Sequence, residues 1–349
     1  MKTALIGLGM VGGTYADALS NLAPDVTLSG IYARSSDSRD AFLREFAAKL
    51  PEGCKSYGSI DEIAEDPDLD FVILATPPNA RLDIVRRLVA AGKPILMEKP
   101  VERTLPAAVE ICDLCDAGGV PLGIVLQHRM RPSAQRLAAL LADGSLGALA
   151  AVEARIPWWR AQSYYDEPGR GSYERDGGGV LLSQAIHPLD LMLSLTGPVD
   201  KVSALAATTA LHNMESEDFV SAGVTFANGA VGSIFATTAA FPGRSDELVF
   251  YCANGTARLQ SDLLELDWQD GRKDVFGQDA PSGAGADPMA YSSERHRALI
   301  EDFATSLRDQ RPSVVTGRDA LMVHGLIEAI EISARDGKTV AVRNMTGGQ

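Results

Sequence analysis

The sequence predicts a two-domain α/β protein, with a doubly wound parallel sheet first and a large, mostly antiparallel open sheet second. In the first third of the chain, short apolar runs alternate with stretches of helical spacing, which is typical of a parallel sheet with crossover helices. After Gln127 the runs become longer and rich in Ala, Val and Thr, and Asn228-Gly229 between two of them is a strong hairpin signal. At 349 residues, the chain is also longer than one average domain.

The periodicity of apolar residues sets the expected order of elements. In the first part we expect strands at residues 3–6, 26–33, 71–75, 94–97 and 121–126, with helices near 11–22, 37–50, 79–91 and 104–118. In the second part we expect strands at 148–157, 199–210, 218–226 and 229–238, followed by helices near 292–308 and 317–335. The domains are therefore placed at 1–124 and 125–344, with 345–349 as a tail.

The composition is that of an ordinary soluble globular protein. Hydrophobic residues make up 46% of the chain and charged residues 22%. The formal charge of −14, from 32 basic and 46 acidic residues, disfavours nucleic acid and anionic membranes as partners, since both reward clustered Lys and Arg. No apolar stretch is long enough to span a bilayer, and four cysteines agree with a reducing compartment, so we expect a cytoplasmic protein.

A glycine turn follows the first expected strand and opens the first helix. It consists of Gly7, Leu8, Gly9, Met10, Val11 and Gly12. In this setting Gly7 permits the tight turn, Gly9 lets the backbone approach a pyrophosphate, and Gly12 lets the helix pack on the sheet. Unpaired N–H groups at the helix N-terminus favour the anion. The pattern therefore predicts a Rossmann domain that binds a nicotinamide dinucleotide.

The end of the second strand favours NADP over NAD. An acid there would bond a ribose 2′-hydroxyl, whereas an arginine accommodates a 2′-phosphate. The tip carries no acid, and Arg34 with Ser35 could hold a phosphate, although Asp37 is close. NAD therefore stays open, as does a role for Arg34 in stacking on adenine. The wall of the same cleft is expected to include Thr76, Pro77 and Asn79.

Lys99 lies in Glu98-Lys99-Pro100, directly after an apolar strand. Open α/β sheets bind their ligands at the carboxyl ends of strands. Burial and neighbouring charges can also bring the pKa of a lysine into a useful range. Taken alone, a lysine in such a loop is more often an exposed surface residue. Together with the glycine turn and the motifs described below, we interpret Lys99 as a catalytic residue that contacts cofactor and substrate, with Glu98 beside it in the cofactor cleft.

A second polar cluster follows three glycines, residues 177–179. The next segment is mostly apolar, but Ser183, His187 and Asp190 are spaced i, i+4, i+7 and share one face of a helix. We interpret His187 as catalytic and Ser183 as a substrate contact. No metal is expected here or at Cys112-x-x-Cys115, because neither motif has further ligands at metal spacing.

Four motifs follow one another in a defined order along the chain. They are the glycine turn, Glu98-Lys99-Pro100, residues 127–132 (Gln-His-Arg-Met-Arg-Pro), and the three glycines with His187 and Asp190. In this order and at these separations the chain resembles the Gfo/Idh/MocA oxidoreductases, such as glucose–fructose oxidoreductase and inositol dehydrogenase. The resemblance covers nearly the whole chain and is specific for the family, not for a substrate. It implies a Rossmann domain followed by an α/β domain on a large, mostly antiparallel sheet.

The resemblance also implies roles for individual residues. Lys99 matches a catalytic lysine, His187 a catalytic histidine, and Gln127 a position that approaches the nicotinamide. Many members carry an aspartate four residues before the histidine, where this chain has Ser183. Because a serine cannot act as a carboxylate base, we expect His187 to take the proton and Lys99 to hydrogen-bond the reacting oxygen.

Aromatic and basic residues precede the three glycines. We assign four of them to the substrate: Trp159, Arg160, Tyr164 and Tyr165. Aromatic faces stack on the C–H surfaces of sugars, and polar tips read hydroxyls or a carboxylate, whereas core packing is the alternative. The acidic segment 212–218 is expected to be a solvated loop rather than a site.

Together these features predict an NAD(P)-dependent dehydrogenase that oxidises a secondary hydroxyl of a sugar, sugar acid or cyclitol. Two alternatives stay open: an NAD-dependent glycosidase of the same family, and a non-catalytic nucleotide-binding regulatory protein. Because an antiparallel sheet needs cover by helices or by another subunit, we also expect a homo-oligomer, a dimer or tetramer, formed through the C-terminal sheet.

Overall fold

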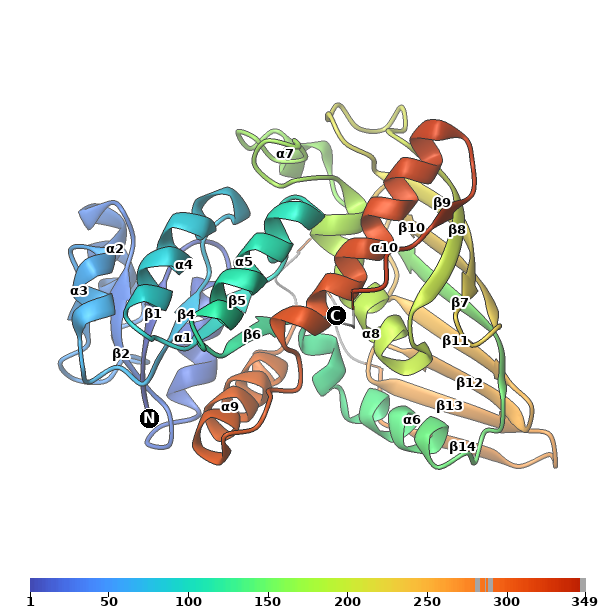
Figure 1. The fold of residues 1–349 in the computed structure, drawn as a ribbon, viewed down its shortest axis with the longest axis horizontal. Coiled ribbons are helices and arrows are strands. Elements are labelled where there is room, and N and C mark those ends of the chain that lie inside the picture. The colour runs from blue at the N-terminus through green and yellow to red at the C-terminus, as the bar shows by residue number, and fades with distance from the viewer. Residues whose placement is uncertain (280–282, 286, 288–290, 346–349) are drawn as a thin grey trace. The chain divides into compact units, whose positions relative to one another are not determined.

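The chain folds into two compact units, each built on its own sheet (Figure 1). The computed structural model describes residues 1–279, 283–285, 287 and 291–345. The first unit comprises residues 1–102, 106–127 and 293–320, and the second comprises 103–105, 128–292 and 321–349. The expected tail lies outside the described residues, apart from Met345.

Six parallel strands form the sheet of the first unit, in the order β3-β2-β1-β4-β5-β6. They are β1 (Lys2–Ile6), β2 (Thr27–Tyr32), β3 (Lys55–Ser56), β4 (Phe71–Leu74), β5 (Ile95–Glu98) and β6 (Leu122–Val125). Every residue of β4, β5 and β6 is buried, as expected for strands covered on both faces. The order reverses between β1 and β4, and in such sheets the ligand crevice lies at the carboxyl ends of the strands at this point.

The helices of the first unit come mainly from the crossovers between these strands. They are α1 (Gly12–Ser20), α2 (Ser36–Glu45), α3 (Ile60–Glu65), the 3₁₀ turn η1 (Pro78–Ala80), α4 (Arg81–Ala90), α5 (Leu105–Ala117) and α9 (Glu294–Asp309). Helix α9 returns from the far end of the chain and packs on α1 and β6. Its Phe303 meets the ring of Phe71 with centroids 5.4 Å apart, and Gly123 leaves the room for it. The domain division at residue 124 did not anticipate this return.

Nine strands form the sheet of the second unit, in the order β14-β13-β12-β11-β7-β10-β9-β8-β15. They are β7 (Leu149–Pro157), β8 (Val199–Ala207), β9 (Phe219–Phe226), β10 (Val231–Thr237), β11 (Glu247–Cys252), β12 (Gly255–Gln260), β13 (Leu263–Trp268), β14 (Lys273–Phe276) and β15 (Val340–Ala341). All neighbours are antiparallel except β7 and β10, which are parallel. The predicted fold class, a parallel Rossmann sheet followed by a mostly antiparallel sheet, is therefore confirmed.

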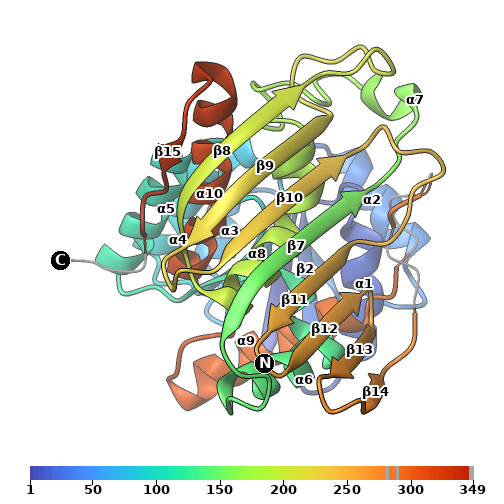
Figure 2. The same cartoon turned by 90° about the vertical axis from the view of Figure 1, so that its right-hand side faces the viewer.

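Helices cover one face of this second sheet. They include α6 (Pro132–Ala142), which packs on β12 and β13, and α8 (Ile186–Thr196), which packs on β7. The unit also contains η2 (Gln127–Met130) at its start, α7 (Gln162–Tyr165), the π-helix η3 (Leu181–Ala185) and most of α10 (Gly317–Asp336). Figure 2 shows the sheet from its other side, with the strands β8 to β13 in front of the helices. Residues alternate between buried and exposed along β9, so only one face joins the core.

The expected strands and helices are present, but several elements were not anticipated. Those missed are β3, α3, α6 and the later strands of the second sheet, β11 to β15. Helix α2 ends at Glu45, earlier than the expected residue 50. The hairpin expected at Asn228-Gly229 joins β9 and β10, and Gly229 has a φ of 88° there.

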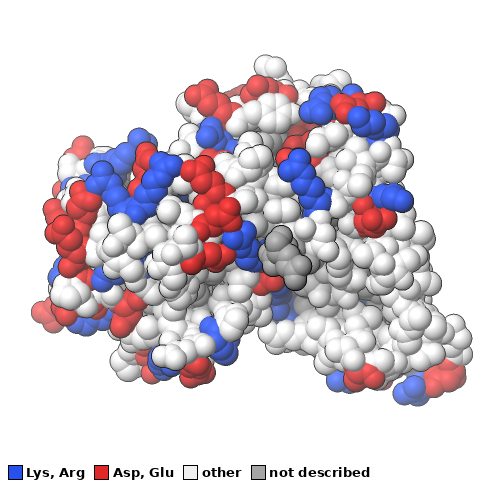
Figure 3. Space-filling view, viewed as in Figure 1, with Lys and Arg blue, Asp and Glu red and all other residues white. Residues whose placement is uncertain are grey.

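On the face drawn in Figure 3, acidic and basic side chains lie beside one another over the helices of the first unit. Arg86 of α4, for example, pairs with Asp83 and Glu110, and Arg318 pairs with Asp113 and Asp116. Across the described ranges, no helix combines the length and the apolar character that a membrane crossing requires.

Candidate active site

The glycine turn lies at the carboxyl end of β1, where the strand order reverses. Gly7 has a φ of 102°, which favours glycine, and a Cβ there would lie 2.6 Å from the carbonyl oxygen of Ala75. A Cβ at Gly9 would meet no atom within 4 Å, so this part of the backbone is open to a ligand. A Cβ at Gly12 would lie 3.0 Å from the ring of Phe42 in α2. The third glycine therefore lets α2 approach α1 closely, and α1 also contacts strand β2 of the sheet.

Helix α1 starts in this turn without a side-chain cap. Its N-cap residue is the apolar Val11, and no side chain of the described chain caps the first turn. The side chain of Met10 is 46% exposed, and Leu8 is half-buried. Backbone N–H groups at an uncapped helix start favour an anion, so the turn has the chemistry that a pyrophosphate requires.

The tip of β2 carries a basic side chain beside a helix start. Arg34 is exposed, and the hydroxyl of Ser35 caps α2 by accepting the N–H of Ser38 at 3.3 Å. Arg39, which sequence reasoning missed, donates to the carbonyl of Ala33 at 2.6 Å and to Ser56 at 3.2 Å. Arg39 lies one helical turn after Ser35, and this spacing places its side chain near the end of β2. The same spacing was the sequence signal from which Arg39 could have been predicted.

A buried arginine holds the turn that carries Lys99. Arg81, at the start of α4, is 2% exposed and donates to the carbonyl of Thr76 through Nε at 3.0 Å and Nη2 at 2.7 Å. Its Nη1 donates to the carbonyls of Glu98 and Pro100, on either side of Lys99. One guanidinium thus connects the ends of β4 and β5. Of the predicted cleft residues in this region, Pro77 and Asn79 are exposed and Thr76 and Lys99 are half-buried.

The sequence contained a signal for Arg81 that we did not use. Arg81, Val85 and Leu88 are the buried residues of α4 and are spaced i, i+4, i+7, so the arginine lies on the apolar stripe. Burial lowers the pKa of the guanidinium to about 10, while the negative charge of Glu98 raises it. Arg81 is therefore charged at neutral pH, and a charged donor makes the stronger hydrogen bonds to carbonyls.

The carboxylate of Glu98 fixes the same turn from the other side. It accepts the hydroxyl of Tyr15 at 2.7 Å and the backbone N–H of Lys99 at 3.1 Å. The ring of His296, from α9, meets Tyr15 edge-on, with its Nε2 atom 3.8 Å from Glu98. Burial lowers the pKa of His296, so this histidine is neutral at neutral pH. Helices α1 and α9 thus both help to hold the backbone that presents Lys99.

In the second unit, the predicted histidine lies on a distorted helix. Residues Leu181–Ala185 form a π-helix that continues into α8, and Pro188 explains the distortion because it has no N–H to donate to the carbonyl four residues earlier. Such π segments are frequent at functional sites. Ser183 is half-buried and His187 is 7% exposed.

The segment after Gln127 is joined to this helix by two contacts. Arg129 forms a bidentate ion pair with Asp190, with Nε–Oδ2 and Nη2–Oδ1 distances of 2.8 and 2.6 Å. The ring of His128 lies against that of His187, with centroids 5.0 Å apart. Asp190 therefore anchors the helix instead of facing a ligand, and His128 borders the predicted base.

Two of the four predicted substrate residues have polar ends that are engaged within the protein. Arg160 is 3% exposed and donates to the carbonyls of Trp159, Gly283 and Gly285, and the hydroxyl of Tyr165 bonds Thr238 at 2.7 Å. Trp159 and Tyr164 are half-buried. Arg160 and Tyr165 thus hold the loops from which Trp159 and Tyr164 project.

The acidic segment 212–218 is not a solvated loop, and our expectation is wrong there. His212, Glu217 and Asp218 are all buried. Asp218 accepts the N–H of Thr209 at 2.7 Å and contacts Nδ1 of His212 at 2.7 Å. The charges looked solvated by composition, but hydrogen bonds to His212 and to residues outside the segment satisfy them inside the unit.

The predicted residues fall into two groups, one in each unit. The first unit brings together the glycine turn, the tip of β2, Thr76 and the Lys99 turn at the carboxyl edge of its sheet, with Gln127 two residues after β6. The second unit brings together Ser183 and His187 on one helix, with the aromatic loops on the same unit. Within the described ranges, no group of three or more His, Cys, Asp and Glu side chains could hold a metal ion.

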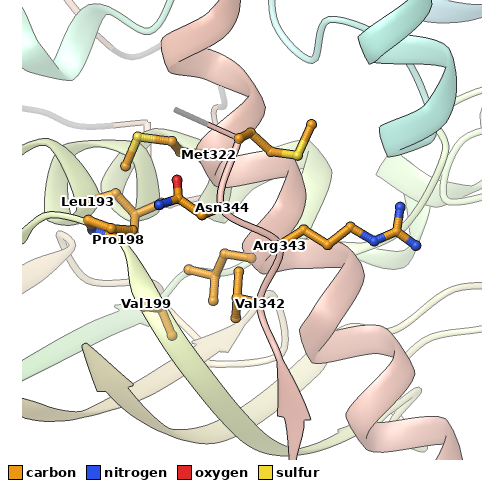
Figure 4. A pocket seen from close by; sticks show the side chains of 9 residues that line it. Leu193, Pro198, Val199, Met322, Val342, Arg343 and Asn344 are labelled. Atoms are coloured by element: carbon orange, nitrogen blue, oxygen red, sulfur yellow. The ribbon is translucent and has the colours of Figure 1, made fainter. Parts of the chain in front are cut away.

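A small apolar pocket of the second unit lies elsewhere. Its walls include Leu193 of α8 and Met322 and Leu326 of α10, and Figure 4 shows Arg343 extending its guanidinium away from them. Leu193 follows His187 by six residues, about 9 Å along the helix. The lining carries no acid or base suited to proton transfer, so the pocket is no candidate for the chemistry.

Comparison with known proteins agrees with the two-domain fold. Residues 1–125 match the model of the oxidoreductase family with an NAD-binding Rossmann fold, and residues 134–258 match the GFO/IDH/MocA C-terminal domain. D-apiose dehydrogenase of Paraburkholderia graminis is 26% identical over 79% of this chain and 74% of its own. Myo-inositol 2-dehydrogenase of Thermotoga maritima is 24% identical over 99% of this chain and 100% of its own. The WlbA dehydrogenase of Bordetella pertussis, solved with NADH and UDP-GlcNAcA, is 26% identical, covers 99% of both chains and has a TM-score of 0.81.

The fold and these matches define an NAD-binding oxidoreductase with a Rossmann domain. The chain belongs to the Gfo/Idh/MocA family. The resemblance inferred from four short motifs is therefore confirmed across both domains.

The role of Arg81 can be tested against an arginine of the same helix. Arg81→Met would leave the carbonyls of Thr76, Glu98 and Pro100 without their donor, and we expect a loss of about 2–4 kcal/mol in the free energy of unfolding. Arg86→Met is the control, because the side chain of Arg86 is 51% exposed and exposed ion pairs contribute about 1 kcal/mol or less. Urea unfolding of both variants makes the comparison, and equal losses would contradict the assignment.

Proposed function

We propose that the protein is an NAD(P)-dependent dehydrogenase that oxidises a secondary hydroxyl of a sugar, sugar acid or cyclitol. The observation that carries the proposal is Lys99, which a buried guanidinium and carboxylate hold at the carboxyl edge of the Rossmann sheet. Relatives named as D-apiose and myo-inositol dehydrogenases support the substrate class.

Several features of the first unit fit a bound dinucleotide. The backbone at Gly9 is open and the start of α1 carries no side-chain cap. Among the described residues, the buried Oγ1 of Thr76 and Oε1 of Gln127 have no hydrogen-bond partner. Buried polar atoms without partners are costly, and a carboxamide could satisfy both. When bound, the nicotinamide ring supplies the hydride acceptor.

The two predicted catalytic residues have separate roles in this proposal. His187 takes the hydroxyl proton at a ring nitrogen, and Lys99 donates a hydrogen bond to the same oxygen as negative charge develops. Ser183, half-buried one turn before His187, orients the substrate hydroxyl. Trp159 and Tyr164 stack on the sugar face.

Turnover tests these roles. Lys99→Ala and His187→Ala should each lower kcat by about 10² to 10⁴, since each removes a positioned proton-transfer or oxyanion group, while nicotinamide binding persists. Absorbance of the reduced nicotinamide would be followed with NAD and NADP against sugars, sugar acids, inositols and UDP-GlcNAcA.

Lys338→Ala, which changes an exposed lysine paired with Asp336, serves as the control and should retain wild-type turnover. Wild-type turnover in both Lys99→Ala and His187→Ala would contradict the catalytic roles proposed for these residues. Release of free sugar from a glycoside without net reduction would instead identify the NAD-dependent glycosidase.

We further propose that NADP is the preferred cofactor. Support comes from the exposed Arg34 at the tip of β2, the absence of an acid in that tip, and the start of α2 beside it. A 2′-phosphate would receive a charged donor there, together with the favourable end of a helix.

Arg34→Ala measures this preference directly. Loss of a charged hydrogen bond costs about 1.5–3 kcal/mol, so the KM for NADP should rise about 10- to 100-fold while the KM for NAD changes little. Ser36→Ala, at a neighbouring exposed hydroxyl, controls for the helix start. If both KM values rise alike, Arg34 stacks on the adenine instead.

We propose a homo-oligomer that forms through the open face of the second sheet. The strand registers place Leu205, Phe235, Val231 and Tyr251 on one face, and three of these side chains are 38–57% exposed: Leu205, Val231 and Tyr251. Exposed apolar side chains grouped on a sheet are typical of an interface between subunits.

The cytoplasm is the proposed location, since the four cysteines are free.

A charge on this face should separate the subunits. We expect Leu205→Glu with Val231→Glu to shift the mass measured by light scattering from a dimer or tetramer to a monomer, because the interface would bury unpaired carboxylates. Leu211→Glu is the control, since Leu211 is 60% exposed but lies in a loop. A monomeric wild type would rule the interface out.

A further inference from the structure

One carboxylate holds the segment that leads into the His187 helix. Glu217 accepts the N–H of Gly179 through Oε2 at 3.1 Å and the N–H of Leu181 through Oε1 at 3.1 Å. Its backbone carbonyl accepts the N–H of Val180, between them, at 2.8 Å. Three consecutive amides therefore end on a single residue. A Cβ at Gly179 would lie 1.8 Å from the carbonyl oxygen of Glu217, so only glycine allows this approach.

These amides open the helix that carries the proposed base. The first N–H groups of a helix have no partner within it and attract negative charge. The π-helix follows immediately, with Ser183 in it and His187 in the first turn of α8. The position of Glu217 therefore fixes where this helix starts, and with it the rotation of Ser183 and His187.

A second carboxyl group, which is half-buried, lies beside the same segment. Glu331 of α10 has its Oε1 3.5 Å from where a Cβ of Gly178 would be. Leu193 of α8 and Leu326 of α10 line one pocket, so parts of these two helices lie near each other. The other charged or titratable groups around this carboxyl pair are Asp218, Glu328, Arg335, Arg103, Tyr173 and Glu215.

The two carboxyl groups differ in their hydrogen bonds. Burial raises the pKa of Glu217, but the N–H groups of Leu181 and Gly179 lower it by favouring the charged form. Burial, and then the charge of Glu217, raise the pKa of Glu331 to about 8. Two close carboxyl groups hold one proton more easily than none. Glu331 therefore keeps its proton to a higher pH than an ordinary glutamate, while the two amides favour the charged form of Glu217.

We propose that Glu217 is a positioning residue for Ser183 and His187, and that Glu331 keeps Glu217 effective by carrying the proton of the pair. The proposal rests on the proposed dehydrogenase function in assigning His187 to catalysis. As the pH rises through about 8, Glu331 ionises, so that Glu217 and Glu331 both carry a negative charge near Gly178 and Gly179. The segment then loosens, and turnover falls on the alkaline side.

The matched test is the same substitution at three carboxyl groups. Glu217→Gln leaves one acceptor where two N–H groups converge, so we expect kcat to fall about 100-fold while nicotinamide affinity stays within twofold. Glu331→Gln keeps Glu217 charged and should remove the decline of kcat above pH 8. Glu301→Gln, at an exposed position of α9 in the first unit, should reproduce the wild-type profile.

Amide hydrogen exchange provides a readout that does not need a substrate. The protection factors of residues 179–183, which correct for the intrinsic pH dependence of exchange, should fall in Glu217→Gln at neutral pH, and in the wild type only as the pH passes about 8. Glu331→Gln should show no such step. Glu217→Asp, whose shorter carboxylate reaches one N–H, should give an intermediate rate and serves if the Gln variant fails to fold.

The pH dependence of the free energy of unfolding also tests the ionisation of Glu331. The folded-state pKa of Glu331 lies above its ordinary value of 4.5, so the unfolded chain releases this proton first. The free energy of unfolding should therefore fall as the pH rises from about 4.5 through about 8, and Glu331→Gln should flatten that slope.

Two results would overturn the proposal. One is unchanged exchange at 179–183 in both Glu217 variants. The other is an equal loss of kcat in the Glu217 and Glu331 variants without a change in pH profile, which indicates packing alone. If the wild type oxidises no sugar, the proposed function fails, but the exchange experiment still decides whether Glu217 positions the helix.

Discussion

Buried backbone polar groups are the constraint on which both groups of candidate residues depend, one in each unit. Lys99 and His187 stand on irregular backbone, where strand or helix hydrogen bonds no longer pair every carbonyl and amide. The first unit meets this need with the guanidinium of Arg81, which serves three carbonyls, and the second with Glu217, which serves three amides. In each unit a charged residue fixes the backbone that carries one of the two proposed catalytic residues.

Local patterns of apolar residues were sufficient to predict much of the fold. The buried strands of the first sheet are continuous apolar runs, and their alternation with helices allows few topologies. The strands β11 to β14 were missed because they are short and closely spaced, so that no long period stands out. Helix α9 could not be placed in the first unit, because its contact between Phe303 and Phe71 joins distant parts of the chain.

The candidate site was predictable where a residue's role follows from its place on one element. The glycine turn and the Lys99 turn each follow a strand, and their position at the sheet edge needs no further knowledge. The supporting residues Arg81 and Glu217 could not be predicted in this way, because their hydrogen-bond partners lie on other elements of the fold. Composition misled at Asp218, where an acidic run is buried because Thr209 and His212 bond its carboxylate. Polarity alone does not say whether a partner is present.

The parallel pairing of β7 with β10 has a consequence for how this scaffold can change. The two strands end side by side, with Pro157 opposite Thr237, and the chain beyond them continues to pair, as Arg160 donates its N–H to Thr238 at 2.9 Å. The loops that bear Trp159 and Phe241 thus leave the sheet as neighbours, and their rings touch edge to face. Insertions or substitutions in either loop remodel one shared rim, while the strand ladder and the Lys99 turn keep their hydrogen bonds.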